Sequence, residues 1–222
     1  EGYLVDDLQD VAVNEKGQSL KGTYVVFDLE TTGFSSVKDK IIEIGAVKVE
    51  NGEITDKYST FVNPKIPIPF RITQLTSITD EMVMESPEIE TILPQFLKFV
   101  GDAVLVAHNA SFDVSFIEEN CRQQGIEPDF TSVDTVGLAR VLLPTLSKFK
   151  LNVVAKALNI SQEHHHRAVD DARVTAEIYV KFIQMLEERG IETLDQMNHF
   201  GAHNAEAIRK MPSYHVIVLA KN

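Results

Sequence analysis

Two acidic side chains, Asp28 and Glu30, end an otherwise apolar stretch that begins at Tyr24. The stretch is rich in Val and Phe, which predicts a buried β-strand, and a Thr-Thr-Gly sequence breaks it after Glu30. Residues two apart on a strand point to the same face, so the two carboxylates share a face with Cα atoms about 6.5–7 Å apart. Burial of carboxylates is costly, and each one raises the pKa of the other. A divalent cation between the two carboxylates would offset both effects.

A third acid, Asp113, stands close behind another apolar stretch at residues 103–107. Ser111 is a typical N-cap residue, and the spacing predicts a helix from there to about residue 124, before Gly125. Asp113 shares one stripe of this helix with four further residues, Phe116, Ile117, Asn120 and Cys121. Asp113 is therefore expected to face the core, although it carries a charge.

The third setting joins a histidine, His166, to a further acid, Asp171, just before a helical apolar face. That face continues at Ala172, Ala176, Tyr179, Ile183 and Leu186. Residues five apart lie about 140° apart around a helix, so both side chains cannot point the same way if both are helical. We therefore expect His166 on the incoming loop and Asp171 in the first turns of the helix.

Together these three settings resemble the DnaQ-like 3′–5′ exonucleases of the DEDDh branch. The family pattern is D-x-E-T-T-G, H-N-x-x-F-D and H-x-x-x-x-D, and it matches residues 28–33, 108–113 and 166–171. One short motif would be weak evidence, but three in order are specific. The resemblance spans residues 23 to about 188. It implies an α/β, RNase H-like fold with a central mixed β-sheet flanked by helices.

The resemblance implies that Asp28, Glu30, Asp113 and Asp171 bind two divalent cations and that His166 is the general base. Carboxylate oxygens suit Mg²⁺ or Mn²⁺ and disfavour zinc. Two such ions about 3.5–4 Å apart can activate a water molecule and stabilise the departing 3′ oxygen. In this interpretation one ion lies on Asp28, Glu30 and Asp171. The second lies on Asp28 and holds Asp113 through water.

The resemblance also implies contacts between five positions and the terminal nucleotide, namely Thr31, Phe34, Ser77, Ile78 and Asn109. Phe34 either stacks on the last base or belongs to the core, and both readings stay open. Ser77 and Ile78 lie in Leu-Thr-Ser-Ile-Thr, which resembles the family's L-T-G-I-T with serine in place of glycine. Asn109 can serve the substrate or a local hydrogen bond.

The two ends of the chain resemble the segments that flank the exonuclease of PolC-type DNA polymerase III alpha chains. In that family the nuclease is inserted within a PHP domain. We interpret residues 23–190 as the nuclease, and residues 1–22 and 191–222 as flanks that belong to the neighbouring PHP-type domain and add little to the nuclease core. A strand is predicted at residues 214–220. The first residue is Glu rather than Met, which fits a fragment.

The implied function is proofreading for a replicative DNA polymerase III. Single-stranded or frayed DNA 3′ ends would be hydrolysed to nucleoside 5′-monophosphates. The implied partners are the DNA 3′ end and the PHP and polymerase domains of the alpha chain. Two alternatives stay open, an RNA-directed 3′–5′ exoribonuclease of the same family and a non-catalytic interaction domain. Loss of at least one acid would be expected in an inert relative, and all four are present.

The composition of the chain bears on its partners and its cellular compartment. The formal net charge of −12 over 222 residues argues against a free-standing nucleic-acid binder. Weak intrinsic affinity is tolerable if a polymerase delivers the DNA end at high effective concentration. No apolar run reaches the length of a membrane span, so no membrane partner is expected. The single cysteine, Cys121, rules out an internal disulfide and favours a reducing cytoplasm.

The remaining elements are read from periodicity and turn residues. Strands are predicted at 24–28, 41–50 and 54–62, with Asn51-Gly52 as a type I′ hairpin turn. Helices are predicted from Ser86-Pro87 to Gly101, at 136–143 and at 151–158.

Overall fold

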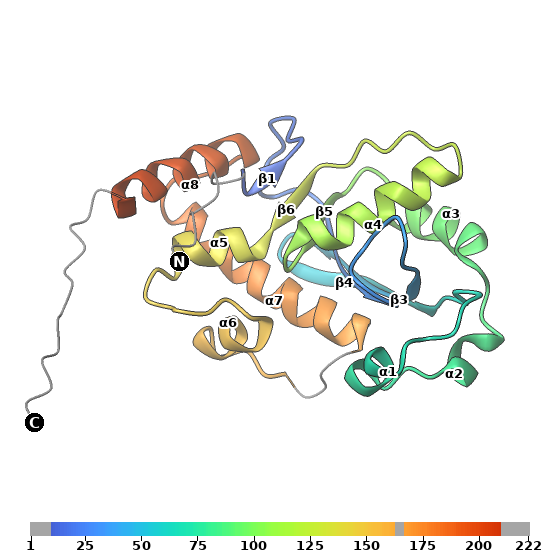
Figure 1. Cartoon of the computed structure of the whole chain (residues 1–222). Coiled ribbons are helices and arrows are strands. Elements are labelled where there is room, and N and C mark those ends of the chain that lie inside the picture. Colours follow the sequence, from blue (N-terminus) through green and yellow to red (C-terminus); the bar gives the residue numbers. More distant parts are fainter. Residues whose placement is uncertain (1–9, 163–166, 210–222) are drawn as a thin grey trace, which may run out of the picture.

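The computed structural model describes residues 10–162 and 167–209. Its centre is one mixed six-stranded sheet with the order β1-β6-β5-β2-β3-β4 (Figure 1). The strands are β1 (Ala12–Val13), β2 (Tyr24–Thr31), β3 (Ile41–Glu50), β4 (Glu53–Phe61), β5 (Val104–Ala107) and β6 (Ser132–Asp134). β5 runs parallel to β2 and to β6, and the other neighbours are antiparallel. The predicted α/β architecture with a mixed sheet is confirmed.

The hairpin between β3 and β4 turns at the predicted dipeptide. Asn51 and Gly52 both have positive φ angles, 52° and 80°. Type I′ turns require this conformation at both central positions, and Asn-Gly adopts it at low cost. The two strands pair from Glu43–Phe61 to Glu50–Glu53, with one shift of register between Lys48 and Val49. The strand that carries the two acids therefore has a well-supported neighbour on one side.

Eight helices lie in the part of the chain that the structure describes. They are α1 (Phe70–Thr76), α2 (Asp80–Met84), α3 (Ile89–Val100), α4 (Ala110–Gln123), α5 (Thr135–Leu142), α6 (Leu151–Ala157), α7 (Ala168–Glu187) and α8 (Leu194–Arg209). None of these is both long enough and apolar enough to cross a membrane. Helix α7 is the long helix predicted after His166, and it packs on β2 and β3.

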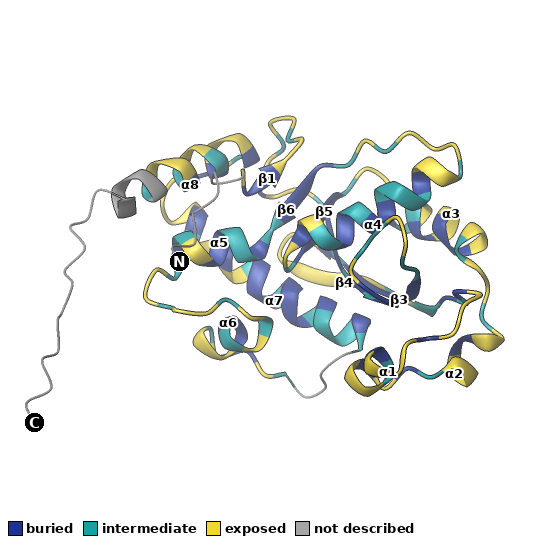
Figure 2. Ribbon diagram, in the orientation of Figure 1, coloured by how far each residue is buried: buried dark blue, intermediate teal, exposed yellow. Residues whose placement is uncertain are grey.

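The two faces of the sheet carry different cores. Val26 and Val106 belong to a cluster with residues of α5, α6, α7 and α8. Phe27 and Leu105 belong to a second cluster with residues of α3 and α4. The sheet interior is buried, and the outer edge strand β4 is largely exposed (Figure 2). Because side chains alternate along β2, the face of Val26 continues to Asp28 and Glu30, which therefore look toward α7.

Helix α4 begins two residues earlier than predicted, because its N-cap is Asn109 instead of Ser111. Asn109 has a positive φ of 72° and makes no side-chain cap hydrogen bond. Instead, Asp134 Oδ1 accepts from the backbone N–H of Asn109 at 2.8 Å and of Ala110 at 3.2 Å. Asp134 also caps α5 through Val136 and Gly137. A side chain distant in sequence thus replaced the local cap that Ser111 suggested.

Helix α3, in contrast, begins later than its Ser-Pro signal indicated. The first helical residue is Ile89, after Glu88 as the N-cap residue. The backbone carbonyl of Pro87 instead accepts from Asn63 N–H at 3.0 Å, so Pro87 holds the incoming chain against the segment after β4.

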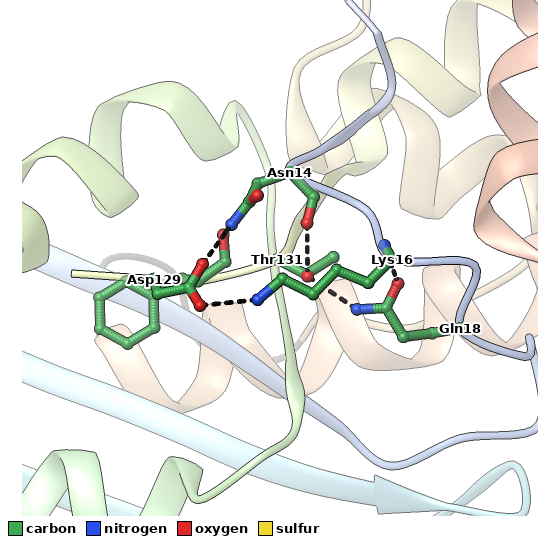
Figure 3. Close-up of polar contacts among 6 residues, drawn as sticks. Asn14, Lys16, Gln18, Asp129 and Thr131 are labelled. Carbon is green, nitrogen blue, oxygen red and sulfur yellow. Dashed lines mark hydrogen bonds and ion pairs between the residues drawn. The ribbon is translucent and has the colours of Figure 1, made fainter.

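The described parts of both flanks pack on the nuclease core, which differs from the expectation that they add little to it. Val11, Ala12 and Leu20 are buried in the same cluster as the residues Ile191, Leu194 and Met197. β1 pairs with β6, and Figure 3 shows the turn after β1 held by polar contacts to the segment before β6. These contacts join Asn14 and Lys16 to Asp129, and Gln18 to Thr131. The strand predicted at 214–220 lies outside the described residues.

Candidate active site

Three of the predicted metal ligands come together above the end of β2. Asp28 and Glu30 are supplied by the strand, and Asp171 by the first turn of α7. One carboxylate oxygen from each of the three lies within 4.8 Å of the others. This spacing suits three ligands of one cation, because oxygen ligands of Mg²⁺ or Ca²⁺ stand about 2.0–2.6 Å from the metal.

Asp113 lies beside this group, held by the strand that carries the other two acids. Its side chain is 3% exposed and projects from the first turn of α4. Asp113 Oδ1 accepts from the backbone N–H of Leu29 at 3.1 Å. Leu29 is the residue between Asp28 and Glu30, so the hydrogen bond fixes Asp113 next to both.

The buried acids of the site have raised pKa values, because too little positive charge lies near them. Burial, followed by the charge of Asp113, raises the pKa of Asp28 well above its ordinary value. Burial, followed by the charge of Glu43, raises the pKa of Glu30 to about 8. Burial also raises the pKa of Asp113 to about 8, against the hydrogen bond from Leu29. A divalent cation would supply the missing positive charge, so this donor set of carboxylate oxygens fits the metal that the resemblance implies.

Three residues that the sequence analysis did not single out support Asp171. Gln162 Nε2 donates to Asp171 Oδ1 at 2.9 Å. Glu43 accepts two hydrogen bonds from Arg167, at 3.0 and 2.9 Å, and one from the backbone N–H of Ala168 at 3.2 Å. Glu43 could have been identified in the same way as Asp28, because it is an acid inside an apolar strand. Gln162 carried no comparable signal.

The predicted base, His166, lies outside the described residues. The other histidine of the motifs, His108, has a structural role. Its Nε2 donates to the carbonyl of Phe149 at 2.7 Å, which leaves Nδ1 to accept from the Thr135 hydroxyl at 2.8 Å. Burial lowers the pKa of His108, so it stays neutral in this setting. His108 therefore fixes the turn into α4.

Phe34 belongs to the surface rather than the core. It is 77% exposed and lies on the loop between β2 and β3. Its ring centroid is 6.4 Å from that of Phe112, and the Arg71 guanidinium is 5.9 Å from it. A ring as exposed as this is available to stack on a base.

The other predicted substrate-binding residues differ in which of their atoms are accessible to a ligand. The Thr31 hydroxyl donates to the carbonyl of Gly33 at 2.7 Å. The Ile78 side chain is fully buried with Ile42, Ile72 and other residues of a third cluster, so only its backbone can meet a ligand. Ser77 is exposed and adopts a positive φ of 61° at the end of α1. Asn109 is also exposed, at the start of α4.

The glycine that ends the first motif has a packing reason. A Cβ atom on Gly33 would stand 2.5 Å from the carboxylate atoms of Asp39. The Asp39 carboxylate also accepts from the backbone N–H of Ser35 at 2.9 Å, which closes the loop. Gly33 thus leaves room for the Asp39 side chain that closes the loop carrying Phe34.

Comparisons with known proteins agree with this geometry. The exonuclease family model RNase_T matches residues 25–179. The chain is 53% identical over its full length to the DNA polymerase III PolC-type of Clostridium perfringens and 42% identical to that of Staphylococcus aureus. It spans only 15–16% of the length of these relatives.

Solved structures show the same fold. Exonuclease X, in complex with 5′ overhanging duplex DNA, is 29% identical with a TM-score of 0.63, over 80% of this chain and 99% of that one. The nuclease domain of 3′hExo, a DEDDh family member bound to rAMP, is 20% identical with a TM-score of 0.65, over 74% and 93%. The resemblance to DEDDh exonucleases and to PolC-type polymerase III chains is thereby confirmed. The chain belongs to the exonuclease family.

Proposed function

We propose that this chain is a metal-dependent 3′–5′ exonuclease that hydrolyses single-stranded or frayed DNA 3′ ends to nucleoside 5′-monophosphates. The observation that carries the proposal is the group of Asp28, Glu30 and Asp171, whose carboxylate oxygens lie within 4.8 Å of one another. Asp113 stands beside them with its charge buried. Acids that converge from two helices and one strand repel one another, and a bound cation offsets that repulsion.

The metals in this proposal are two ions of Mg²⁺ or Mn²⁺. Asp28, Glu30 and Asp171 would hold one ion, and Asp28 with Asp113 the other. When bound, such ions activate a water molecule and neutralise charge on the phosphate. The carboxylates are all oxygen donors, and Cys121, the single cysteine, is buried, so the site offers nothing that favours zinc.

The chain's own residues would do the remaining work. His166 would accept the proton of the attacking water, a task that suits a side chain with a pKa near neutrality. The exposed ring of Phe34 would stack on the terminal base, with Thr31, Ser77, Ile78 and Asn109 around the same nucleotide. Stacking does not read sequence, which suits an enzyme that must remove any terminal nucleotide.

The proposal extends to the partners of the chain. The PolC-type relatives are several times longer than this chain, so the nuclease would act as one domain of a polymerase III alpha chain and proofread its product. The PHP-type domain would adjoin residues 1–22 and 191–222, and the protein would act in the cytoplasm. The net charge of −12 supports delivery of the DNA end by an attached polymerase, because strong independent binding to DNA is not expected.

The test uses the 222-residue chain with a 5′-labelled single-stranded DNA, in Mn²⁺, in Mg²⁺ and in EDTA. We expect a ladder of products shortened from the 3′ end in either metal and none in EDTA. Asp171→Asn should abolish the ladder, whereas Asp170→Asn, a matched change in the same helical turn, should leave it. A blocked 3′ end should stop cleavage. Cleavage that persists with the 3′ end blocked would contradict a 3′–5′ exonuclease.

An RNA strand of the same sequence gives the second arm of this test. Faster cleavage of RNA than of DNA would assign the chain to the RNA-directed relatives. Absence of cleavage of either strand, with Mn²⁺ bound, would instead favour a non-catalytic interaction domain.

A further inference from the structure

We infer that Glu43 and Arg167 position Asp171, because they fix the first turn of α7 on β3 and so set where the Asp171 carboxylate meets Asp28 and Glu30. Neither Glu43 nor Arg167 is assigned as a metal ligand or base. The inference rests on the proposed function of the same site. It concerns how the third acid is brought to the other two, which come from a different element.

The anchor is a single buried carboxylate with three donors. Glu43 is 1% exposed, and its Oε1 accepts from both Nε and Nη2 of Arg167 at 3.0 and 2.9 Å. Its other oxygen accepts from the backbone N–H of Ala168 at 3.2 Å. Arg167 is the N-cap residue of α7 and makes no side-chain cap hydrogen bond of its own. Glu43 therefore caps a helix from a neighbouring strand, a role that usually belongs to a local residue.

The strand register places this anchor directly beside the acids. In the antiparallel pair of β2 and β3, Glu30 stands opposite Glu43 and Asp28 stands opposite Gly45. Opposite residues share a face, so the two metal ligands and the anchor lie on the same side of the sheet. Like charges directly opposite each other are unfavourable, and the Arg167 guanidinium supplies the charge that offsets Glu43.

Gly45 lets the helix come close enough for this contact. A Cβ atom at Gly45 would stand 2.0 Å from Val169 N and 2.1 Å from the carbonyl carbon of Ala168. Any other residue would push the first turn of α7 away from the sheet. The Arg167 guanidinium also lies 5.2 Å from the ring centroid of Phe61 on β4, a second contact that restrains it.

Arg167 and Asp171 are one helical turn apart on α7. Asp171 follows Arg167 by four residues, about 6 Å along the helix axis. Its backbone N–H donates to the Arg167 carbonyl at 3.0 Å. A shift of the first turn is therefore passed directly to the Asp171 carboxylate, and a metal site is sensitive to such shifts.

The experiment compares four variants of the 222-residue chain with the wild type. Arg167→Met removes the positive charge and both hydrogen bonds to Glu43. Arg167→Lys keeps the positive charge but not the pair of hydrogen bonds. Gly45→Ala displaces the first turn of α7 without a change of charge. Arg122→Met is the control, because Arg122 pairs with Glu118 at 3.0 Å on the exposed side of α4. Mn²⁺ binding is measured by titration without DNA, and kcat and KM are measured on single-stranded DNA.

We expect Arg167→Met and Gly45→Ala to bind Mn²⁺ about 10–100-fold more weakly and to lower kcat by a similar factor. The KM for DNA should change by less than about threefold, because the surface around Phe34 is untouched. Arg167→Lys should recover part of the Mn²⁺ affinity, since a lysine ammonium keeps the charge but not the two-pronged contact. Arg122→Met should match the wild type in every measurement.

The inference is overturned if folded Arg167→Met binds Mn²⁺ and turns over within about twofold of the wild type. If Arg167→Met does not fold by circular dichroism, Arg167→Lys decides, and wild-type Mn²⁺ affinity in that variant overturns the inference. A wild-type chain that neither binds Mn²⁺ nor cleaves DNA removes the proposed function itself. The two failures are thereby distinguishable.

Discussion

The backbone N–H of Leu29 donates to Asp113 Oδ1 at 3.1 Å, which links α4 to β2 at the residue between Asp28 and Glu30. The link brings an acid from a separate helix to the edge of a group of three. It also leaves the second oxygen of Asp113 for other partners. Asp113 thus has a fixed position although its carboxylate is buried. A substitution that keeps the hydrogen bond from Leu29 but removes the carboxylate charge tests the charge alone.

Asp113→Asn should lower nuclease turnover by at least about 100-fold and leave the metal-free chain as stable as the wild type or more stable. The asparagine carbonyl can still accept from Leu29, and the buried charge is gone. Turnover on single-stranded DNA and Tm in EDTA measure the two effects. Asp102→Asn, in the exposed turn before β5, is the control. A marked fall in Tm with full activity would show that Asp113 is only structural.

Without metal, the chain should lose stability as the pH rises. The folded pKa values of Glu30 and Asp113, both about 8, lie well above the ordinary values of 4.5 and 3.8. Between about pH 4.5 and 8 the unfolded chain releases protons that the folded chain retains, so unfolding becomes more favourable. This part of the stability is fully present below the ordinary pKa and lost by pH 8. We expect Tm in EDTA to fall by roughly 5 °C or more from pH 5 to 8, since about 1 kcal/mol shifts Tm by roughly 2–4 °C at this size.

The control for this pH dependence is Glu30→Gln, which removes one of the titrating groups. Its Tm should fall less steeply over the same pH range. Saturating Mn²⁺ should also flatten the curve for the wild type, because the cation binds the ionised acids. Equal slopes in the wild type and in Glu30→Gln would show that other groups govern the dependence.

The sequence predicted the parts of the fold that have a local cause. The alternation along β2, the Asn51-Gly52 turn and the apolar stripe of α7 each follow from neighbouring residues, and the structure agrees with them. β1 and β6 are two and three residues long, too short to give a periodic signal, and the sequence analysis did not predict them as strands of this sheet. Each exists because a partner strand is adjacent.

In the site, too, the sequence predicted residues with a local signal and missed contacts between distant residues. Asp28, Glu30, Asp113 and Asp171 were identified by their types in unusual positions, and the structure places the four together. Arg167, Gln162 and the cap from Asp134 could not be predicted, because each contacts residues that are distant in sequence or depends on the exact start of a helix. Periodicity gives the face of a side chain and does not give its partner.

His166→Ala should lower turnover by about 100- to 10,000-fold while Mn²⁺ affinity stays largely unchanged. Removal of the base should also remove the rise in rate through neutral pH. The pH–rate profile of kcat at saturating Mn²⁺ measures this, with His164→Ala as the control. An unchanged profile in His166→Ala would move the role to another group, with His165 as the first to test.

Ser77→Gly should stabilise the chain by about 0.5–1 kcal/mol and leave Mn²⁺ affinity unchanged. Ser77 has a φ of 61°, a left-handed conformation that disfavours a side chain and that glycine adopts freely. Tm in EDTA should rise by a few degrees. The matched change Ser111→Gly, in the first turn of α4, should lower Tm, because glycine weakens a helix.

The flanks provide the last prediction, because their described residues pack on the nuclease core. The sequence interpretation places the nuclease at residues 23–190. In the structure Asn198 donates to the carbonyl of Ala12 and accepts from its N–H, both at 2.8 Å, so α8 covers β1. Leu20 N–H donates to the Glu192 carbonyl and Leu194 N–H to the Gln18 carbonyl, at 2.8 and 2.9 Å.

A fragment of residues 10–209 should therefore unfold cooperatively and cleave single-stranded DNA, whereas residues 23–190 should be strongly destabilised. The shorter fragment lacks the buried side chains Val11, Leu20, Ile191, Leu194 and Met197. Each such side chain contributes about 1.5–3 kcal/mol, so their joint loss approaches the roughly 5–15 kcal/mol that stabilises a whole domain. Thermal unfolding by near-UV circular dichroism, with activity on the same samples, measures the difference. A fragment of residues 23–190 with wild-type Tm and turnover would show that the two flanks rest on the nuclease without supporting it, and would restore the boundary at residues 23 and 190.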